Sequence, residues 1–301
     1  MKHFISVDDL RIEDAKSIFA LTERLKSSSK TLLKIGQSHS MMRGKTMAMI
    51  FAKPSTRTRV SFEVAMQQLG GQAIFLGMND IQLGRGESIK DTSLVLGRYV
   101  HVIMARLFAH DDMIELAKWS QVPVVNGLTD FLHPCQAMAD LFTMKEKFKK
   151  LEGLKLAYVG DGKNNVTHSL MYACKKLGVE MTVGAPKNYH PDVSVTKQTG
   201  FKVTTDPIEA VKNADAVYTD TWVSMGKEKE KKKREKIFKK FQVNPKLMAH
   251  AKSSAIFLHC LPAHRGYEVT DEIMDGKQSA IFDQAENRLH VQKGILAWLL
   301  G

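Results

Sequence analysis

Hydroxyl and guanidinium side chains gather at residues 51–59, with the sequence FAKPSTRTR. The segment follows an apolar run and precedes a stretch whose apolar residues recur at helical spacing, so it should open a helix. Free N–H groups and the helix dipole favour an anion at such an end, and a guanidinium adds charge-assisted hydrogen bonds to phosphate oxygens. The plainer alternative is that a hydroxyl only caps the helix while the arginines face solvent. Two arginines beside the cap favour a phosphate site, with the candidate residues Ser55, Thr56, Arg57 and Thr58.

Two more segments of the first half place polar side chains after apolar runs. Arg106 ends the first run, and residues 133–136, with the sequence HPCQ, follow the second. The guanidinium of Arg106, the imidazole of His133 and the amide of Gln136 could together polarise one carbonyl oxygen. Taken singly, each has a plain alternative, because a lone histidine more often supports the fold.

The second half has two comparable segments, at residues 220–226 (DTWVSMG) and 259–262 (HCLP). Asp220 offers an acceptor for an ammonium group, and residues 224–226 offer a hydroxyl and backbone groups for a carboxylate. Cys260 alone would be interpreted as an inert buried cysteine. No His, Cys and Asp residues have metal-ligand spacing, so we expect neither a metal nor a cofactor.

Alternating apolar runs and helical stretches must position these residues. The β-rich runs are 46–52, 72–76, 101–105, 122–126, 155–159, 181–184, 216–219, 255–258 and 280–282. The clearest helical stretches are 61–69, 89–99, 111–119 and 136–148. This alternation predicts an α/β protein with two doubly wound parallel-sheet domains.

The domain boundary should fall where LysLys and Gly interrupt the apolar pattern, near residues 149–153. We therefore predict a first domain over residues 1–148 and a second over 149–288. The amphipathic stretch at 289–301 should pack back on the first domain. Because ligands bind beyond the carboxyl ends of strands in open α/β sheets, the polar residues that directly follow these runs are the candidate site residues.

Charge and composition leave other classes of protein with little support. The net charge of +12 would permit nucleic-acid binding, but much of it lies in one lysine-rich run at 227–240 (KEKEKKKREKIFKK). That run has mixed sign and no recognisable nucleic-acid motif, so we interpret it as a solvated helix. Three cysteines without disulfide spacing and no stretch of about 20 apolar residues predict a protein without membrane contact, in a reducing compartment. The expected location is the cytoplasm, with a matured organellar chain as the alternative.

Taken together, the motifs STRTR, HPCQ, DTWVSMG and HCLP resemble the aspartate and ornithine carbamoyltransferase family. STRTR and HPxQ mark the family at large, whereas SMG and HCLP resemble its ornithine branch. Segments 82–92, 160–165 and 286–288 agree with the same pattern. The resemblance implies transfer of a carbamoyl group from carbamoyl phosphate to ornithine, which gives citrulline and phosphate. Another amine, such as putrescine or N-acetylornithine, is the alternative acceptor.

The resemblance also assigns residues and domains. It makes the first domain the carbamoyl phosphate-binding domain and the second the ornithine-binding domain, with the active site in the cleft between them. The implied carbamoyl phosphate site comprises Ser55, Thr56, Arg57, Thr58, Gln82, Arg106, His133, Gln136, Cys260, Leu261 and Arg288. The implied ornithine site comprises Asn165, Asp220, Ser224 and Met225, with Asn164 as an alternative to Asn165. The implied catalytic residues are Arg106, His133, Gln136, Cys260 and Arg288.

One implied residue lies in a stretch that spacing alone would interpret as a solvated loop. Gln82 stands in GMNDIQLGRGE, where three glycines and an Asn-Asp pair predict an exposed loop. In the family, the corresponding loop reaches a neighbouring subunit's site. The resemblance therefore implies a homotrimer with shared active sites.

Overall fold

The computed structural model describes residues 1–34, 36–223 and 228–301. The chain forms two compact units. Unit 1 comprises Met1–Met138 and Arg288–Gly301, and unit 2 comprises Ala139–Asn287. None of the helices in the described part of the chain is long and apolar enough to cross a membrane.

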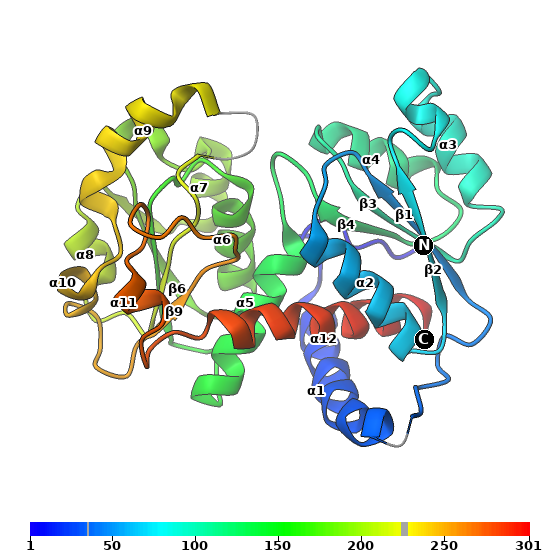
Figure 1. Ribbon diagram of the computed structural model, residues 1–301, viewed down its shortest axis with the longest axis horizontal. Coiled ribbons are helices and arrows are strands. Elements are labelled where there is room, and N and C mark those ends of the chain that lie inside the picture. Colours follow the sequence, from blue (N-terminus) through cyan, green and yellow to red (C-terminus); the bar gives the residue numbers. More distant parts are fainter. Residues whose placement is uncertain (35, 224–227) are drawn as a thin grey trace. The chain divides into compact units, whose positions relative to one another are not determined.

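Among the described residues, unit 1 contains a four-stranded parallel sheet in the order β2-β1-β3-β4 (Figure 1). Its strands are β1 (Thr46–Phe51), β2 (Gln72–Gly77), β3 (Val102–Arg106) and β4 (Val124–Leu128). The strands β3 and β4 are buried along their whole length, as expected for parallel strands covered on both faces. β2 is an edge strand, and it is partly exposed.

Helices surround this sheet, and the first of them was not predicted. They are α1 (Ile12–Lys34), α2 (Thr56–Gln68), α3 (Ile89–Leu96) and α4 (His110–Trp119). The long helix α1 buries apolar side chains at helical spacing, among them Ala15, Ile18, Phe19 and Leu25. The start of α2 follows the predicted capping chemistry, because the Thr58 N–H donates to Ser55 Oγ at 3.3 Å.

The described part of unit 2 contains a five-stranded parallel sheet in the order β7-β6-β5-β8-β9. Its strands are β5 (Lys155–Val159), β6 (Glu180–Gly184), β7 (Lys202–Thr204), β8 (Ala216–Tyr218) and β9 (Ile256–Leu258). The prediction of two doubly wound parallel-sheet domains is thereby confirmed. The short strand β7 was not predicted, and it is polar enough to lack an apolar signal.

The strand predicted at 280–282 is wrong. Ser279 forms only an isolated bridge with Phe257, and helix α12 (Ile281–Leu300) begins directly afterwards. Three apolar residues are too few to separate a strand from the first turn of a helix. Ala280 and Ile281 are buried, whereas Phe282 is exposed, as one side of a helix would be.

Shorter helices cover the sheet of unit 2. They are α6 (Asn165–Leu177), α7 (Val193–Thr199), α8 (Pro207–Val211), α9 (Lys231–Phe238), α10 (Pro245–Met248) and α11 (Asp271–Met274). One buried apolar cluster joins strand residues such as Val217 and Phe257 to Phe238 and Phe241. The lysine-rich run thus contributes to the core through Phe238.

Two helices contribute residues to both units. They are α5 (Pro134–Phe148) and α12, which starts eight residues before the predicted terminal stretch. Arg288 therefore lies inside α12 rather than before it, and it groups with unit 1. Within unit 1 the fully buried Lys293 of α12 donates to Ser29 Oγ at 2.7 Å and to Gln68 Oε1 at 2.9 Å. These bonds join α12 to α1 and α2.

Candidate active site

The candidate anion site of unit 1 lies at the carboxyl ends of two neighbouring strands. The register of the sheet pairs Phe51 of β1 with Arg106 of β3. The Ala52 N–H also donates to the Arg106 carbonyl at 2.9 Å. The N-terminus of α2 and the side chain of Arg106 therefore start from the same edge of the sheet, as the topology of an open α/β sheet requires.

Five predicted side chains of unit 1 are buried polar groups. Their exposed fractions do not exceed 6%, and they are Thr58, Arg106, His133, Gln136 and Arg288. Arg288 donates to Gln136 Oε1 at 2.5 Å and to Thr58 Oγ1 at 3.3 Å. Segments 152 positions apart in the chain are thus joined by direct hydrogen bonds.

The imidazole of His133 belongs to the same group. Burial lowers its pKa well below the usual value of 6.5, and the charges of Arg288 and then Arg106 lower it further. The ring is therefore neutral near pH 7, with one N–H to donate and one nitrogen to accept. Burial also raises the pKa of the neighbouring Cys135 thiol to about 12, so this cysteine is not a nucleophile.

The remaining predicted residues of unit 1 face solvent to different degrees. Ser55 is half-buried, whereas Thr56 and Arg57 are exposed on the first turn of α2. Gln82 is exposed and begins a short 3₁₀ helix, Gln82–Arg85, after the edge strand β2. The predicted exposed loop therefore contains one helical turn.

In unit 2 the acceptor Asp220 and the thiol of Cys260 lie side by side. The register pairs Tyr218 of β8 with Leu258 of β9, so both residues follow adjacent strand ends. Cys260 Sγ donates to Asp220 Oδ1 at 3.1 Å. Burial raises the pKa of the Cys260 thiol well above its usual value, and the negative charge of Asp220 raises it further. The group remains a thiol at neutral pH and acts as a donor rather than a nucleophile.

Asn164 and Asn165, which the sequence could not separate, have different surroundings. Asn164 Oδ1 accepts from the Thr167 N–H at 2.8 Å and caps α6. Its Nδ2 donates to the Asp161 carbonyl and to Tyr158 Oη, both at 2.8 Å. These bonds occupy the Asn164 amide within the fold, which favours Asn165, the half-buried first residue of α6, as the ligand-binding residue. Ser224 and Met225 lie outside the described residues.

The side chains of Asp220, His259 and Cys260 bring three potential metal ligands within 4.8 Å of one another. Sequence spacing did not reveal this group. His259 Nδ1 accepts from the Leu261 N–H at 2.9 Å, and its Nε2 lies 3.4 Å from the buried Glu268 carboxylate. Because protein groups face both ring nitrogens, His259 supports the turn after β9, where Leu261 has a φ of 59°. That turn positions Cys260.

Sequence reasoning missed two buried polar contacts near these residues. Arg234, inside the lysine-rich run, forms an ion pair with Asp161 at 2.7 Å. Gln284 of α12 accepts from the His259 N–H at 2.9 Å and donates to Asp140 at 2.6 Å. The burial of Arg234 had a weak signal, because Arg234 and Phe238 stand one helical turn apart in an otherwise charged stretch, but its partner Asp161 had none.

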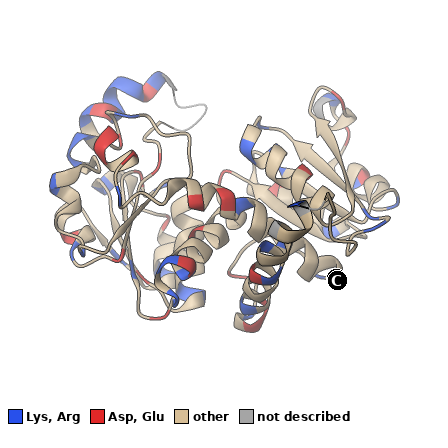
Figure 2. Ribbon diagram, turned by 60° about the horizontal axis from the view of Figure 1, so that its bottom comes forward, with Lys and Arg blue, Asp and Glu red and all other residues tan. Residues whose placement is uncertain are grey.

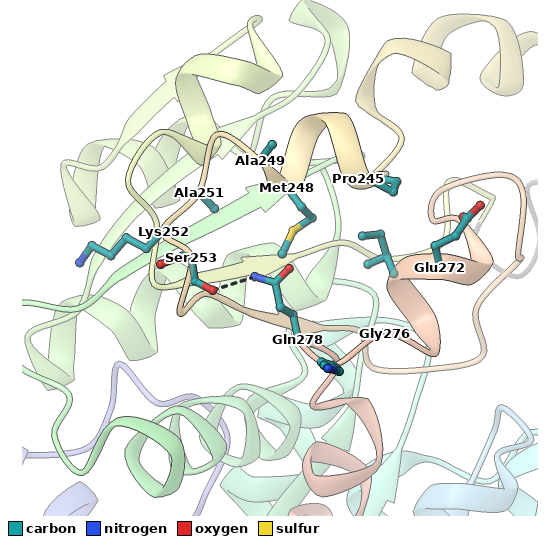
Figure 3. Close-up of a pocket in the computed structure, with 11 residues that line it drawn as sticks. Pro245, Met248, Ala249, Ala251, Lys252, Ser253, Glu272, Gly276 and Gln278 are labelled. Atoms are coloured by element: carbon teal, nitrogen blue, oxygen red, sulfur yellow. Dashed lines mark hydrogen bonds between the residues drawn. The ribbon is translucent and has the colours of Figure 1, made fainter.

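A surface hollow of about 610 Å³ lies elsewhere in unit 2. Figure 3 shows its lining, which includes Met248, Lys252, Glu272 and Gln278. None of its lining residues belongs to the predicted substrate sites. The hollow therefore does not compete with the strand-end residues as the candidate active site.

A parallel α/β fold with buried hydrogen-bond donors at strand ends suits a small anionic ligand, and comparison with known proteins shows the family. The family model "Aspartate/ornithine carbamoyltransferase, carbamoyl-P binding domain" matches residues 2–146. The model "Aspartate/ornithine carbamoyltransferase, Asp/Orn binding domain" matches residues 152–299. The chain belongs to the aspartate/ornithine carbamoyltransferase family.

Similar proteins agree with this assignment. The ornithine carbamoyltransferase of Pyrococcus horikoshii is 57% identical over 277 residues, which cover 89% of this chain and 87% of that protein. That of Thermococcus kodakarensis is 52% identical over 306 residues, covering 99% and 96%. The solved structure of ornithine carbamoyltransferase from Pyrococcus furiosus is similar with a TM-score of 0.93 and 51% identity, covering 100% of this chain and 97% of that one.

Proposed function

We propose that this protein transfers the carbamoyl group of carbamoyl phosphate to the side-chain amine of L-ornithine, giving L-citrulline and phosphate. The observation that carries the proposal is the buried group of Thr58, Arg106, His133, Gln136 and Arg288 in unit 1. Two guanidinium groups, a neutral imidazole and an amide held in one place suit a small anion with a carbonyl oxygen. The names of the similar proteins support ornithine as the acceptor.

The carbamoyl phosphate site divides into a phosphate part and a carbonyl part. Ser55, Thr56, Arg57 and Thr58 hold the phosphate at the N-terminus of α2, where N–H groups point outward. Arg106 and Arg288 neutralise its charge. His133 and Gln136, with Thr58, stabilise the oxygen that becomes negative as the amine attacks.

The ornithine site contains a negatively charged side chain, whereas the carbamoyl phosphate site contains positively charged ones. Asp220 binds the α-ammonium group of ornithine, and Asn165, Ser224 and the Met225 backbone bind its α-carboxylate. Cys260, with the backbone carbonyls of Cys260 and Leu261, orients the side-chain amine toward the carbonyl carbon. These assignments rest on the motif resemblance and on the contact between Cys260 and Asp220.

The chemistry follows from these groups without a covalent enzyme intermediate. The deprotonated amine forms a C–N bond to the carbonyl carbon, and the tetrahedral intermediate collapses as the C–O bond to phosphate breaks. Phosphate leaves with the electron pair of that bond, and its oxygen takes up the extra proton of the nitrogen, directly or through water. The raised pKa of the Cys260 thiol supports direct attack, since an inert thiol is a poor nucleophile. Transfer requires both substrates at one place, and the predicted site in a cleft between the domains stays a prediction.

We also propose that the active form is a homotrimer in which Gln82 of one subunit contacts the phosphate bound by its neighbour. The exposed position of Gln82 after an edge strand supports this proposal. Ile74 of the same strand is 49% exposed, and a partly apolar sheet edge is a surface that proteins usually cover. The free state of all three cysteines fits a reducing compartment such as the cytoplasm.

The test is a single assay that measures phosphate and the ureido product in parallel. Ornithine, putrescine and N-acetylornithine are supplied separately with carbamoyl phosphate. We expect equal amounts of phosphate and citrulline with ornithine, and little product with the other amines. A higher kcat/KM for putrescine or N-acetylornithine would replace ornithine with that amine. Phosphate release without any ureido product would contradict carbamoyl transfer.

A further inference from the structure

The lysine-rich helix α9 contains one arginine that is not solvated. Figure 2 shows Lys and Arg residues along this helix, and its lysines 231, 232, 233 and 236 are exposed. Arg234 is only 4% exposed, and Phe238, one turn later, is fully buried. The helix therefore turns this one cation inward, toward the body of unit 2.

The guanidinium of Arg234 bridges two loops. Its Nη1 donates to Asp161 Oδ2 at 2.7 Å and to the Trp222 carbonyl at 2.8 Å. Its Nε donates to Glu230 at 2.8 Å, and the guanidinium lies 4.9 Å from the centre of the Tyr189 ring. A planar guanidinium with several fixed donors can hold such a set, whereas a lysine ammonium is a flexible point charge.

Asp161 lies near the start of the loop that leads from β5 into α6. Its Oδ1 accepts from the Lys163 N–H at 3.0 Å, and its carbonyl accepts from Asn164 Nδ2 at 2.8 Å. Asn164 in turn caps α6 and so fixes the first turn of that helix, which begins at Asn165. Because Asn164 links Asp161 to the first turn of α6, a shift of Asp161 would also move Asn165.

Trp222 is held from two sides by the same helix. Its carbonyl accepts from Arg234, and its ring stacks on Phe238 with centroids 5.8 Å apart and planes 20° apart. Trp222 follows Asp220 closely in the chain, after strand β8. The helix therefore fixes the backbone that carries Asp220.

Stability is a weak explanation for this arrangement. Desolvation of two buried charges offsets most of their attraction, and apolar residues of similar volume often replace such pairs without loss. Geometry is a better explanation, because both loops joined by Arg234 carry proposed ornithine-binding residues.

We propose that Arg234 is a positioning residue for the amine substrate. It fixes the Asp161 loop and the Trp222 backbone relative to each other, so that Asn165 and Asp220 bind the α-carboxylate and the α-ammonium group of one amino acid. This inference rests on the proposed function, because it assigns these residues to ornithine.

The experiment compares the variants Arg234→Met and Arg234→Lys with Lys232→Met, an exposed lysine of the same helix. For each we would measure kcat, KM for ornithine and, by calorimetry, the Kd of carbamoyl phosphate. For Arg234→Met we expect KM for ornithine to rise at least about tenfold, since small misplacements of binding groups are costly. The Kd of carbamoyl phosphate should change less than about twofold, because the proposed donors belong to unit 1. Arg234→Lys should give an intermediate KM, and Lys232→Met should match the parent.

A merely structural role would reduce the amount of active protein and lower kcat without this separation of the two substrates. If Arg234→Met does not fold, the double variant Arg234→Met/Asp161→Leu removes both buried charges and should restore folding. It should retain the raised KM for ornithine. A parental KM for ornithine in any folded Arg234→Met protein, or equal losses for both substrates, would overturn the positioning role alone. If the unsubstituted protein made no citrulline from ornithine and carbamoyl phosphate, both the proposed function and this inference would be overturned.

Discussion

The two units place opposite chemistry at the same topological position. In unit 1 the strand ends carry buried donors, including Arg106 and the neutral His133. In unit 2 they carry Asp220, an acceptor, next to the thiol of Cys260. Both sheets are parallel, so both collect loops and helix N-termini at one edge. The fold determines where a ligand binds, and the charge of a few residues determines which ligand it is.

The two units also differ in what holds these side chains in place. In unit 1 the side chains hold one another, because Arg288 bonds both Gln136 and Thr58. In unit 2 the proposed ornithine-binding residues Asn165 and Asp220 lie close in the chain to Asp161 and Trp222, which Arg234 bonds. The hydrogen-bond donors of unit 1 should therefore already be in place before a ligand binds. Such preorganisation lowers the cost of stabilising charge in a transition state.

The largest expected effect comes from removing Arg57, a cation of the proposed phosphate site. Arg57→Ala should lower kcat/KM by at least about a hundredfold, because a charge-assisted phosphate contact and the alignment it provides are both lost. Arg59→Ala is the matched control, since Arg59 is also exposed on α2 but pairs with Glu63 at 3.2 Å. Steady-state kinetics would measure both. Parental affinity for carbamoyl phosphate in Arg57→Ala would show that the phosphate binds elsewhere.

The second prediction addresses the acceptor site. Asp220→Asn keeps the shape of the side chain but removes the negative charge, so KM for ornithine should rise about 10- to 100-fold. The Kd of carbamoyl phosphate should stay within about twofold, because sites without shared partners behave independently. Calorimetry and initial rates measure the two quantities separately. Parallel losses for both substrates would instead indicate damage to the whole unit.

The third prediction tests whether Gln82 of a neighbouring subunit completes the carbamoyl phosphate site. Arg57→Ala and Gln82→Ala proteins, each expected to be nearly inactive alone, are unfolded together and refolded as a mixture. In a cyclic trimer with random mixing, about one quarter of all sites would combine an intact α2 start with an intact Gln82. We therefore expect recovery to roughly this fraction of parental activity. Proven mixed trimers without recovery would place Gln82 away from its neighbour's site.

The parts of the molecule differ in how far sequence could predict them. Strands β1, β3 and β5 are buried apolar runs, and their positions were predicted to within a few residues. The motifs predicted residues whose side chains do cluster, such as Thr58, Gln136 and Arg288. Both successes depend on local patterns or on a resemblance.

Contacts between distant segments were beyond the sequence. Arg234 and Asp161 are 73 positions apart, and nothing in either segment indicates the other. The run at 280–282 failed for a different reason, because a short apolar stretch fits a strand and a helix equally well. Partners of buried charges become visible only when the fold brings the segments together.

The smallest expected effect concerns His133 and the pH dependence of stability. The folded pKa of His133 lies well below 6.5, because burial and the charges of Arg288 and Arg106 oppose protonation. An unfolded histidine has a pKa near 6.5, so below that pH the unfolded chain takes up a proton that the folded chain refuses. The free energy of unfolding should therefore fall as pH decreases from about 6.5 toward the folded pKa, and this contribution should be constant above that range.

His133→Asn removes this proton uptake and should flatten the profile between about pH 6.5 and 5. The difference in slope from the parent should approach about 1.4 kcal/mol per pH unit at most. Urea denaturation at fixed protein concentration would measure it, because assembly also changes apparent stability. Other titrating groups are common to both proteins and cancel in the difference. Equal slopes for His133→Asn and the parent would mean that the folded imidazole takes up a proton as readily as the unfolded one, and is therefore protonated at the acidic end of this pH range. It would then add a third positive charge beside Arg106 and Arg288, and the contrast between a neutral donor in unit 1 and an acidic acceptor in unit 2 would have to be redrawn.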